Sequence, residues 1–262
     1  MSDYRHKKRF GQNFLRDQNI VRKIVTAALL TDADRALEIG PGLGALTDEL
    51  LHAAGQVEVM EVDRDLIARL KERHDPRLLV HEGDALSLQW DQLLRNPPYV
   101  LVANLPYNIS TPILFKIIEH RDVFKRLVLM FQKEVGDRIR ASPGTKNYSV
   151  LSIFSQLHFS IEQVCSVAPT AFIPPPKVQS VVLAFTPLAK PRAHLTNADL
   201  FRKVVRAAFN QRRKTLRNAL RLLDIDGALL DSALMEVAID PQRRGETLTL
   251  EEFAALSNAI AA

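Results

Sequence analysis

The sequence predicts an α/β fold, in which a mostly parallel sheet carries helices on both faces and a small all-helical domain follows. Two observations predict it. Short apolar runs alternate with helical patterns from Arg35 to Gln132, and strand patterns stop after Pro191, where amphipathic stripes replace them. We therefore place a domain boundary near residue 190, which divides the chain into residues 1–190 and 191–262.

The elements of the first domain follow one another in a regular order. A first helix is expected over 17–30, where apolar residues recur at helical spacing. Alternation of strands and helices then argues for a parallel sheet covered on both faces. In chain order we expect strands at 35–40, 56–62, 77–83, 99–105 and 126–132, and helices at 43–54, 64–74 and 111–120.

Beyond Lys133 the alternation of strand and helix patterns is less regular. The proline-rich stretch "PTAFIPPPKV" (169–178) predicts a stiff loop between two strands. In the C-terminal part, "TLEE" (249–252) is a capping box that opens a last helix. The other expected elements are helices at 133–141 and 148–157, strands at 159–167 and 180–188, and helical apolar stripes within 201–209 and 216–223.

Composition narrows the class of protein. The polar, basic N-terminus is not followed by an apolar run, so it does not resemble a signal peptide, and no window is apolar enough for a membrane span. Cys165 is the only cysteine, which excludes an intramolecular disulfide and a multi-cysteine metal site. The seven histidines show no metal-ligand spacing. We expect a cytoplasmic protein without a metal site.

The positive charge is concentrated in one segment. Residues 202–221 carry eight Lys and Arg and no acid, although the whole chain has a net charge of only +5. A smaller basic run lies at 5–9. A solvated helix face is one interpretation, but this density favours contact with nucleic-acid phosphates. The candidate RNA-binding residues are Arg202, Lys203, Arg206, Arg212, Arg213, Lys214, Arg217 and Arg221.

Three successive strands should carry ligand-binding groups to one edge of the sheet. The first runs into "EIGPGLG" (38–44), where glycines such as Gly40 let the backbone approach a ligand. The second ends at Glu61, which can bind ribose hydroxyls, and the third at Asp84, which can accept from an adenine amine. The third glycine comes one residue too early for a pyrophosphate-binding fingerprint. A nucleoside without phosphate, such as S-adenosylmethionine, fits this pattern.

Two similar tetrapeptides flank the fourth strand, "NPPY" (96–99) and "NLPY" (104–107). In this architecture ligands bind outside the carboxyl ends of the strands. Asn96 precedes the strand and should lie at the opposite edge, whereas Asn104 follows it. The second tetrapeptide is therefore the predicted site, and the first is a turn that leads into the strand.

The residue types of the second tetrapeptide suit methyl transfer to an adenine amine. The Asn104 side-chain oxygen and a backbone carbonyl such as that of Leu105 can accept the two amine hydrogens and orient the nitrogen. Tyr107 can stack on an extruded base, and Phe172 could cover the other face of that base. The candidate catalytic residues are Asn104, Leu105, Pro106, Tyr107 and Phe172.

Taken together, the motifs resemble those of the ribosomal RNA adenine dimethyltransferases. They are "FGQNFL" (10–15), "EIGPGLG", "EVD", "GDAL", "NLPYNIS" and "FIPPPKV", and they occur in family order over residues 10–178. Together with the basic helical tail, the resemblance covers nearly the whole chain. It is most specific for the bacterial enzymes that dimethylate two adjacent adenosines near the 3′ end of small-subunit (16S) rRNA.

The resemblance has several implications. It implies a Rossmann-like class I S-adenosylmethionine-dependent methyltransferase sheet, and a helical domain that docks on rRNA. It implies a monomer whose substrate is 16S rRNA within a late small-subunit (30S) assembly intermediate. Cofactor contacts would come from Asn13, Leu15, Gly40, Glu61, Asp84 and Asn104.

Three other interpretations remain open. A sister group dimethylates large-subunit (23S) rRNA and confers macrolide resistance, but the "NLPYNIS" form, the triple proline and the long C-terminal unit favour the small-subunit type. A non-catalytic assembly factor on the same fold would need neither the cofactor residues nor Asn104. A DNA adenine methyltransferase would need a target-recognition domain, which the sequence does not indicate.

Overall fold

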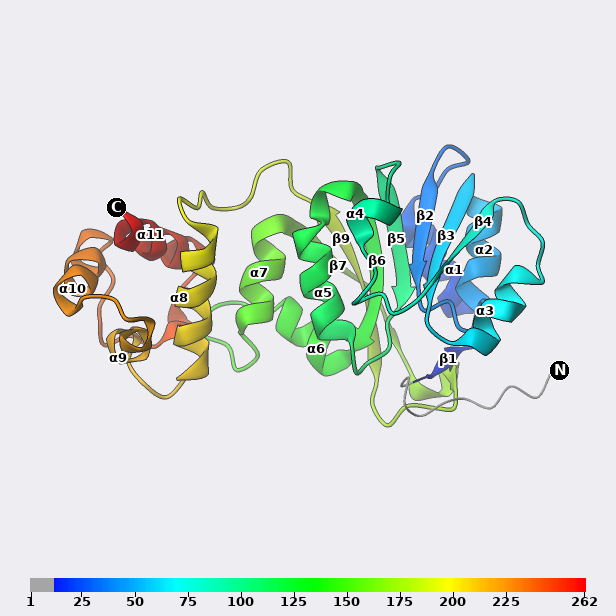
Figure 1. Ribbon diagram of the computed structural model, residues 1–262. Coiled ribbons are helices and arrows are strands. Elements are labelled where there is room, and N and C mark those ends of the chain that lie inside the picture. Colours follow the sequence, from blue (N-terminus) through cyan, green and yellow to red (C-terminus); the bar gives the residue numbers. More distant parts are fainter. Residues whose placement is uncertain (1–11) are drawn as a thin grey trace. The chain divides into compact units, whose positions relative to one another are not determined.

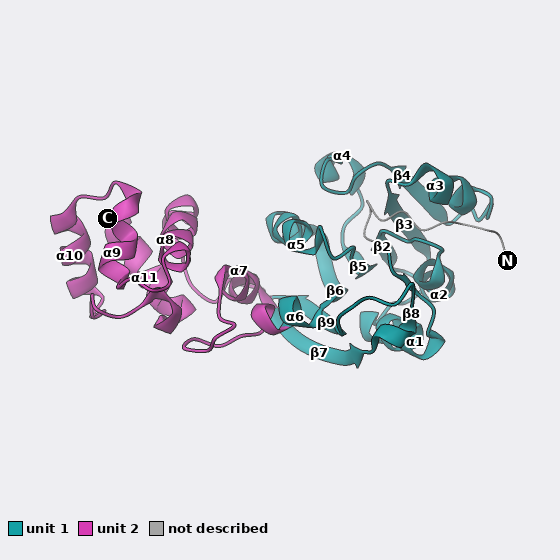
Figure 2. Cartoon of the chain, turned by 90° about the horizontal axis from the view of Figure 1, so that it is seen from below, with its two compact units in different colours: residues 1–136, 160–187 teal, residues 137–159, 188–262 magenta. Residues whose placement is uncertain are grey.

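The computed structural model describes residues 12–262 and divides the chain into two compact units (Figures 1 and 2). The sheet unit comprises the chain up to Gly136 together with Ser160–Pro187, and the helical unit comprises Asp137–Phe159 and Leu188–Ala262. The helical unit resumes close to the boundary placed near residue 190. It also includes residues 137–159, which the sequence placed in the first domain. The basic run at 5–9 lies outside the described residues.

A seven-stranded sheet of order β4-β3-β2-β5-β6-β9-β7 forms the centre of the α/β fold. Neighbouring strands from β4 to β6 are parallel, and β9 runs antiparallel to β6. The parallel α/β sheet predicted from the sequence is confirmed. The strands are β2 (Arg35–Ile39), β3 (Gln56–Glu61), β4 (Leu78–Glu82), β5 (Tyr99–Asn104), β6 (Phe124–Gln132), β7 (Phe159–Val167) and β9 (Ser180–Pro187).

Helices lie on both faces of this sheet, with α1 and α2 on one face and α4 and α5 on the other (Figures 1 and 2). Strands β2 and β5 are buried along most of their length because both of their faces are covered, which explains the apolar run of β5. The helices are α1 (Gln18–Ala28), α2 (Ala45–Ala53), α3 (Arg64–Lys71), α4 (Trp90–Leu93), α5 (Ser110–Glu119) and α6 (Lys133–Ile139), with short 3₁₀ turns at Arg121–Val123 and Pro169–Ala171.

A second, two-stranded sheet joins the described N-terminal residues to the proline-rich loop. Strand β1 (Phe14–Leu15) pairs antiparallel with β8 (Phe172–Ile173). Leu15 is opposite Phe172, and both side chains are buried in the core that packs around α1 and α2. This pairing fixes the chain just before α1 against the sheet unit.

The helical unit has its own aromatic core. Phe209 packs against Phe253 and Tyr148, with ring centroids 6.0 and 5.7 Å apart. The capping box at Thr249 and Glu252 is confirmed, with both reciprocal hydrogen bonds formed. Within residues 12–262, no helix has the length and apolar character needed to cross a membrane. The helices are α7 (Val150–His158), α8 (Ala198–Asn210), α9 (Leu216–Leu220), α10 (Gly227–Glu236) and α11 (Leu250–Ala261), with 3₁₀ turns at Arg221–Leu223 and Gly245–Thr247.

Candidate active site

A cavity of about 260 Å³ lies at the carboxyl ends of β2, β3, β4 and β5. Because these strands are parallel neighbours, the residues that follow them meet at one edge of the sheet. The volume is close to the lower end of small-molecule sites, about 300 Å³. The predicted site residues that line it are Asn13, Leu15, Gly40, Glu61, Asp84, Asn104, Leu105, Pro106 and Tyr107.

The turn after β2 brings backbone close to the cavity. Gly40 and Gly42 have φ of +68° and +59°, a conformation that favours glycine. A Cβ atom on Gly42 would lie 2.9 Å from the Phe14 ring. The glycine turn and the residues before α1 are therefore packed against each other at the cavity wall.

Glu61 lies at the end of β3 with its carboxylate held by backbone donors. Its Oε1 accepts from the Val62 and Asp63 amides at 2.8 and 2.9 Å, and Oε2 accepts from Gly42 at 3.4 Å. Burial raises the pKa of the Glu61 carboxyl, while these three hydrogen bonds oppose the rise. The bonds fix the carboxylate at the position where it can accept from a ligand.

Asp84 follows β4 and lies in an exposed part of the cavity rim. Its Oδ1 accepts from the Leu86 amide at 2.9 Å, which leaves the side chain in a defined orientation. The preceding Gly83 amide donates to the Glu61 carbonyl at 2.8 Å, so the end of β4 stays joined to the end of β3. Two carboxylates thus lie on adjacent strand ends.

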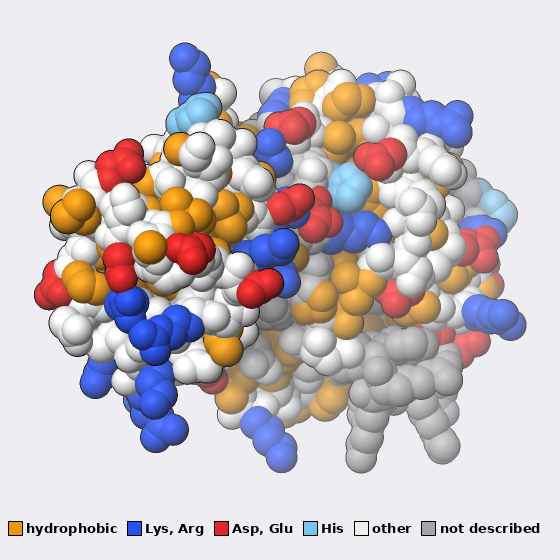
Figure 3. Space-filling view, turned by 60° about the vertical axis from the view of Figure 1, so that its left-hand side comes forward, with side chains coloured by type: hydrophobic (Ala, Val, Ile, Leu, Met, Phe, Trp, Pro, Cys, Tyr) orange, Lys and Arg blue, Asp and Glu red, His pale blue; other side chains and the backbone are white. Residues whose placement is uncertain are grey.

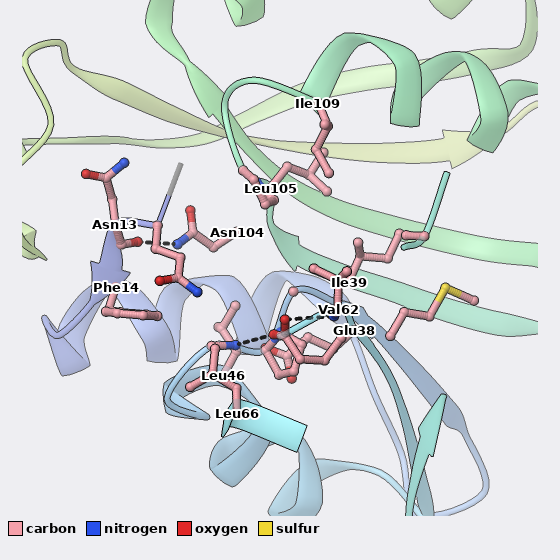
Figure 4. Close-up of a pocket in the computed structure, with 18 of the residues that line it drawn as sticks. Asn13, Phe14, Glu38, Ile39, Leu46, Val62, Leu66, Asn104, Leu105 and Ile109 are labelled. Carbon is pink, nitrogen blue, oxygen red and sulfur yellow. Dashed lines mark hydrogen bonds between the residues drawn. The ribbon is translucent and has the colours of Figure 1, made fainter. Parts of the chain in front are cut away.

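Asn104 is oriented by the N-terminal part of the described chain. Its Nδ2 donates to the backbone carbonyl of Asn13 at 3.1 Å, and Figure 4 shows the two residues turned toward each other. A carbonyl can only accept, so this bond selects the amide orientation. Within the described residues the Asn104 Oδ1 makes no hydrogen bond, and it remains available as an acceptor.

Tyr107 is fixed through its hydroxyl group. The Tyr107 hydroxyl lies 2.6 Å from the Ser180 hydroxyl on β9, and burial raises the pKa of the tyrosine. The turn itself is closed by the Ile109 amide, which donates to the Pro106 carbonyl at 3.1 Å. The ring therefore has one defined position at the cavity.

The other tetrapeptide lies at the opposite edge, as its position before β5 predicts. The Asn96 amide donates to the Tyr99 hydroxyl at 3.4 Å, and that hydroxyl donates to Glu58 at 3.0 Å. Tyr99 is fully buried. The hydrogen bonds made by "NPPY" therefore stay within the fold, and Asn96 does not line the cavity.

Phe172 does not line the cavity. Its side chain is only 2% exposed and belongs to the core, because β8 pairs with β1 and turns the ring inward. The neighbouring Ile173 points outward and is 52% exposed. The structure thus separates Phe172 from the four residues of the "NLPY" turn.

Sequence reasoning missed Glu38, which lines the cavity from β2. Its carboxyl is buried and accepts from the Thr47 hydroxyl at 2.6 Å. Burial raises the pKa of Glu38 to about 8, and the Thr47 bond and the charge of Arg73 only partly oppose this. An acid between the apolar residues Leu37 and Ile39 of a buried strand was the signal that could have found it.

The basic segment lies on the surface of the helical unit, where Figure 3 shows Lys and Arg side chains gathered together. All eight predicted residues are exposed or half-buried. Acids from elsewhere in the sequence neutralise part of the charge. The ion pairs seen among the described residues include Arg202–Asp199, Arg212–Glu246 and Arg217–Asp231.

The described residues contain no cluster of three or more His, Cys, Asp or Glu that could hold a metal ion. The cavity is instead lined by hydrogen-bond acceptors and apolar side chains. The groups available to a ligand are therefore carboxylates and side-chain amides that can orient it, together with the rings of Phe14 and Tyr107.

Comparison with known proteins gives concordant results. The family model described as ribosomal RNA adenine dimethylase matches residues 4–261. "Ribosomal RNA small subunit methyltransferase A" of Syntrophotalea carbinolica is 55% identical over 98% of both chains, and the protein of that name from Geobacter metallireducens is 47% identical over 98% of this chain and 96% of its own.

Two solved structures are also similar along nearly their whole length. A dimethyladenosine transferase from Plasmodium falciparum has a TM-score of 0.77 and 33% identity, and covers 93% of this chain and 95% of its own. The 23S rRNA methyltransferase ErmE has a TM-score of 0.71 and 25% identity, and covers 95% of this chain and 100% of its own. This chain belongs to the ribosomal RNA adenine dimethylase family.

Proposed function

We propose that this protein is an S-adenosylmethionine-dependent methyltransferase that acts on the 6-amino groups of two adjacent adenosines near the 3′ end of 16S rRNA. The product would be N6-dimethyladenosine in the small ribosomal subunit. The observation that carries the proposal is the oriented Asn104 amide, which shares one cavity with Glu61 and Asp84. The relatives named as small-subunit rRNA methyltransferases support the choice of RNA.

The donor set suits the proposed cofactor. Glu61 is fixed by three backbone amides and can accept from ribose hydroxyls, while Asp84 can accept from the adenine amine. Gly40 and the residues Asn13 and Leu15 would complete the binding surface. S-adenosylmethionine supplies a methyl group on a positively charged sulfur.

The residues of the "NLPY" turn would orient the substrate amine. Asn104 Oδ1 and the Leu105 carbonyl accept its two hydrogens and aim the nitrogen lone pair toward the methyl donor. Pro106 packs beside Gly40, where an added Cβ would lie 3.6 Å from its ring, so the turn stays close to the cofactor side. Tyr107 stacks on the extruded base. Phe172 receives no role in this proposal because its ring is in the core.

The helical unit would dock on the RNA. We assign phosphate contacts first to the exposed cations without an ion pair among the described residues, such as Lys203, Arg213 and Lys214. Arg212 and Arg217 would contact phosphate only if they gave up their ion pairs with Glu246 and Asp231. We further propose that the protein acts as a monomer, in the cytoplasm, on a 30S assembly intermediate.

The test is incubation with labelled S-adenosylmethionine and unmethylated small subunits, with 23S rRNA and DNA as competing substrates. Dimethyladenosine in 16S rRNA alone supports the proposal. Label in 23S rRNA would indicate an enzyme of the macrolide-resistance type. Tight subunit binding without label would indicate an assembly factor.

The role of Asn104 has a matched control before the start of the same strand. Asn104→Ala should reduce methyl transfer by about a hundredfold or more while RNA binding is retained, because the amine loses its oriented acceptor. Asn96→Ala, in the similar tetrapeptide at the opposite edge, should leave transfer unchanged. Equal rates for the two variants would contradict the assignment.

A further inference from the structure

One ammonium group holds together the loop after β4. Lys116, on α5, donates to the carbonyl oxygens of Ala85, Leu86 and Leu88 at 3.0, 2.8 and 2.6 Å. An ammonium has three donors, so its capacity is fully used by these three acceptors. The Lys116 Nζ also lies 5.2 Å from the centre of the Trp90 ring, which adds a cation–π contact.

The segment that Lys116 holds, residues 84–88, is termed the Asp84 loop. The Asp84 carbonyl accepts from the Ser87 and Leu88 amides at 2.8 and 2.9 Å, and its side chain accepts from Leu86. The carbonyls of the loop accept from Lys116, and the Ala85 carbonyl also accepts from the Trp90 indole N–H at 3.0 Å. Asp84 and Ala85 both line the cavity. A shift of the loop would therefore move the Asp84 carboxylate.

The helix that carries Lys116 begins at the other side of the cavity. Helix α5 starts at Ser110, whose hydroxyl donates to the Tyr107 carbonyl at 3.2 Å. The "NLPY" turn thus passes directly into α5. Lys116 lies along the same helix and reaches the Asp84 loop, so one rigid element touches both the turn after β5 and the loop after β4.

We infer that Lys116 is a positioning residue that fixes the adenine-binding Asp84 loop relative to the Asn104 turn. The inference rests on the proposed function, since it assumes that Asp84 contacts the adenine of the cofactor. Lys116 does not line the cavity and acts through the loop. Its contribution should appear in cofactor affinity and not in the rate at saturating cofactor, because it sets the binding geometry of the free protein.

The charge on Lys116 is consistent with this role. Burial lowers the pKa of the Lys116 ammonium, and the negative charge of Asp84 opposes that shift. A charged donor forms stronger hydrogen bonds than a neutral one. An arginine would keep the charge, but its planar guanidinium cannot direct three N–H groups to three converging carbonyls in the same way.

The test measures S-adenosylmethionine affinity of the full chain by calorimetry. Lys116→Met keeps the apolar stem and should raise the Kd about tenfold, with kcat at saturating cofactor changed by less than about twofold. Lys116→Arg should give an intermediate Kd. Lys125→Met is the control, because Lys125 pairs with Asp34 at the opposite edge of the sheet, and it should leave the Kd unchanged.

A double-mutant cycle separates positioning from general stability. If Lys116 acts through the loop, Lys116→Met combined with Asp84→Asn should lose no more affinity than the weaker-binding single variant. Additive losses, or a Kd for Lys116→Met equal to that of the unchanged protein, would overturn the inference. Should Lys116→Met fail to fold by circular dichroism, Lys116→Arg decides the question. Failure of the unchanged protein to bind the cofactor would instead overturn the proposed function.

Discussion

The buried carboxyl of Glu38 should make the stability of the sheet unit depend on pH. Its pKa is about 8 in the folded protein, against an ordinary value of 4.5 that applies when the chain is unfolded. Between these values the folded chain holds one more proton than the unfolded chain. The contribution of this carboxyl to the free energy of unfolding should therefore be largest below pH 4.5 and be lost as pH rises toward 8, at about 1.4 kcal/mol per pH unit.

Over the whole window this loss amounts to about 5 kcal/mol, a large fraction of the typical stability of a domain, about 5–15 kcal/mol. Glu38→Gln removes the titration and keeps an oxygen that can accept from Thr47, whose hydroxyl lies 2.6 Å from the carboxylate. The variant should therefore gain stability relative to the unchanged protein as pH rises. The gain should be small at pH 5 and approach its full value at pH 9.

The assay is urea unfolding between pH 5 and pH 9, followed by the fluorescence of Trp90, the single tryptophan, which is buried in the sheet unit. Glu72→Gln is the control for the loss of one carboxyl, because Glu72 is exposed in the same unit. Parallel pH profiles for the unchanged protein and Glu38→Gln would refute the argument that burial keeps this carboxyl protonated.

Two further predictions concern the RNA. Tyr107→Phe and Ser180→Ala should each lower kcat/KM for rRNA about fivefold, because each removes the hydroxyl pair that fixes the ring. The double variant should lose no more than either single one, and additive losses in a methyl-transfer assay would contradict the pairing. Charge reversal at Arg213 and Lys214 should flatten the salt dependence of RNA binding by about two units of slope. Charge reversal at Arg212 should change the slope less, because Glu246 already neutralises this arginine. Equal slopes for single charge reversals at Arg212, Arg213 and Lys214 would contradict the prediction that Arg212 contributes least.

The sequence was sufficient for the parallel sheet because short stretches rich in apolar residues alternate along the chain with helical patterns. The fourth strand was expected at 99–105 and is Tyr99–Asn104. This accuracy placed Asn104 and Asn96 at opposite edges without knowledge of any contact. The direction of parallel strands then fixed where Gly40, Glu61 and Asp84 must lie.

The remaining features depend on contacts between distant segments, which no local pattern records. A two-residue strand such as β1 has no periodicity, so its pairing with β8 and the resulting burial of Phe172 could not be predicted. The absence of acids within 202–221 suggested an unpaired basic face. Asp231 and Glu246 nevertheless reach two of its arginines from later in the chain.

The hydrogen bond between Asn104 and the Asn13 carbonyl bears on the order in which the cavity forms while the chain is being synthesised. Asn13 precedes β1, and β1 is held by β8, which leaves the ribosome long after the "NLPY" turn. A nascent chain that ends before Phe172 contains every strand whose carboxyl end lines the cavity, but it lacks β8, the strand that pairs with β1 next to Asn13. The strand pairing that anchors the segment beside Asn13 can therefore form only after the proline-rich loop has been made.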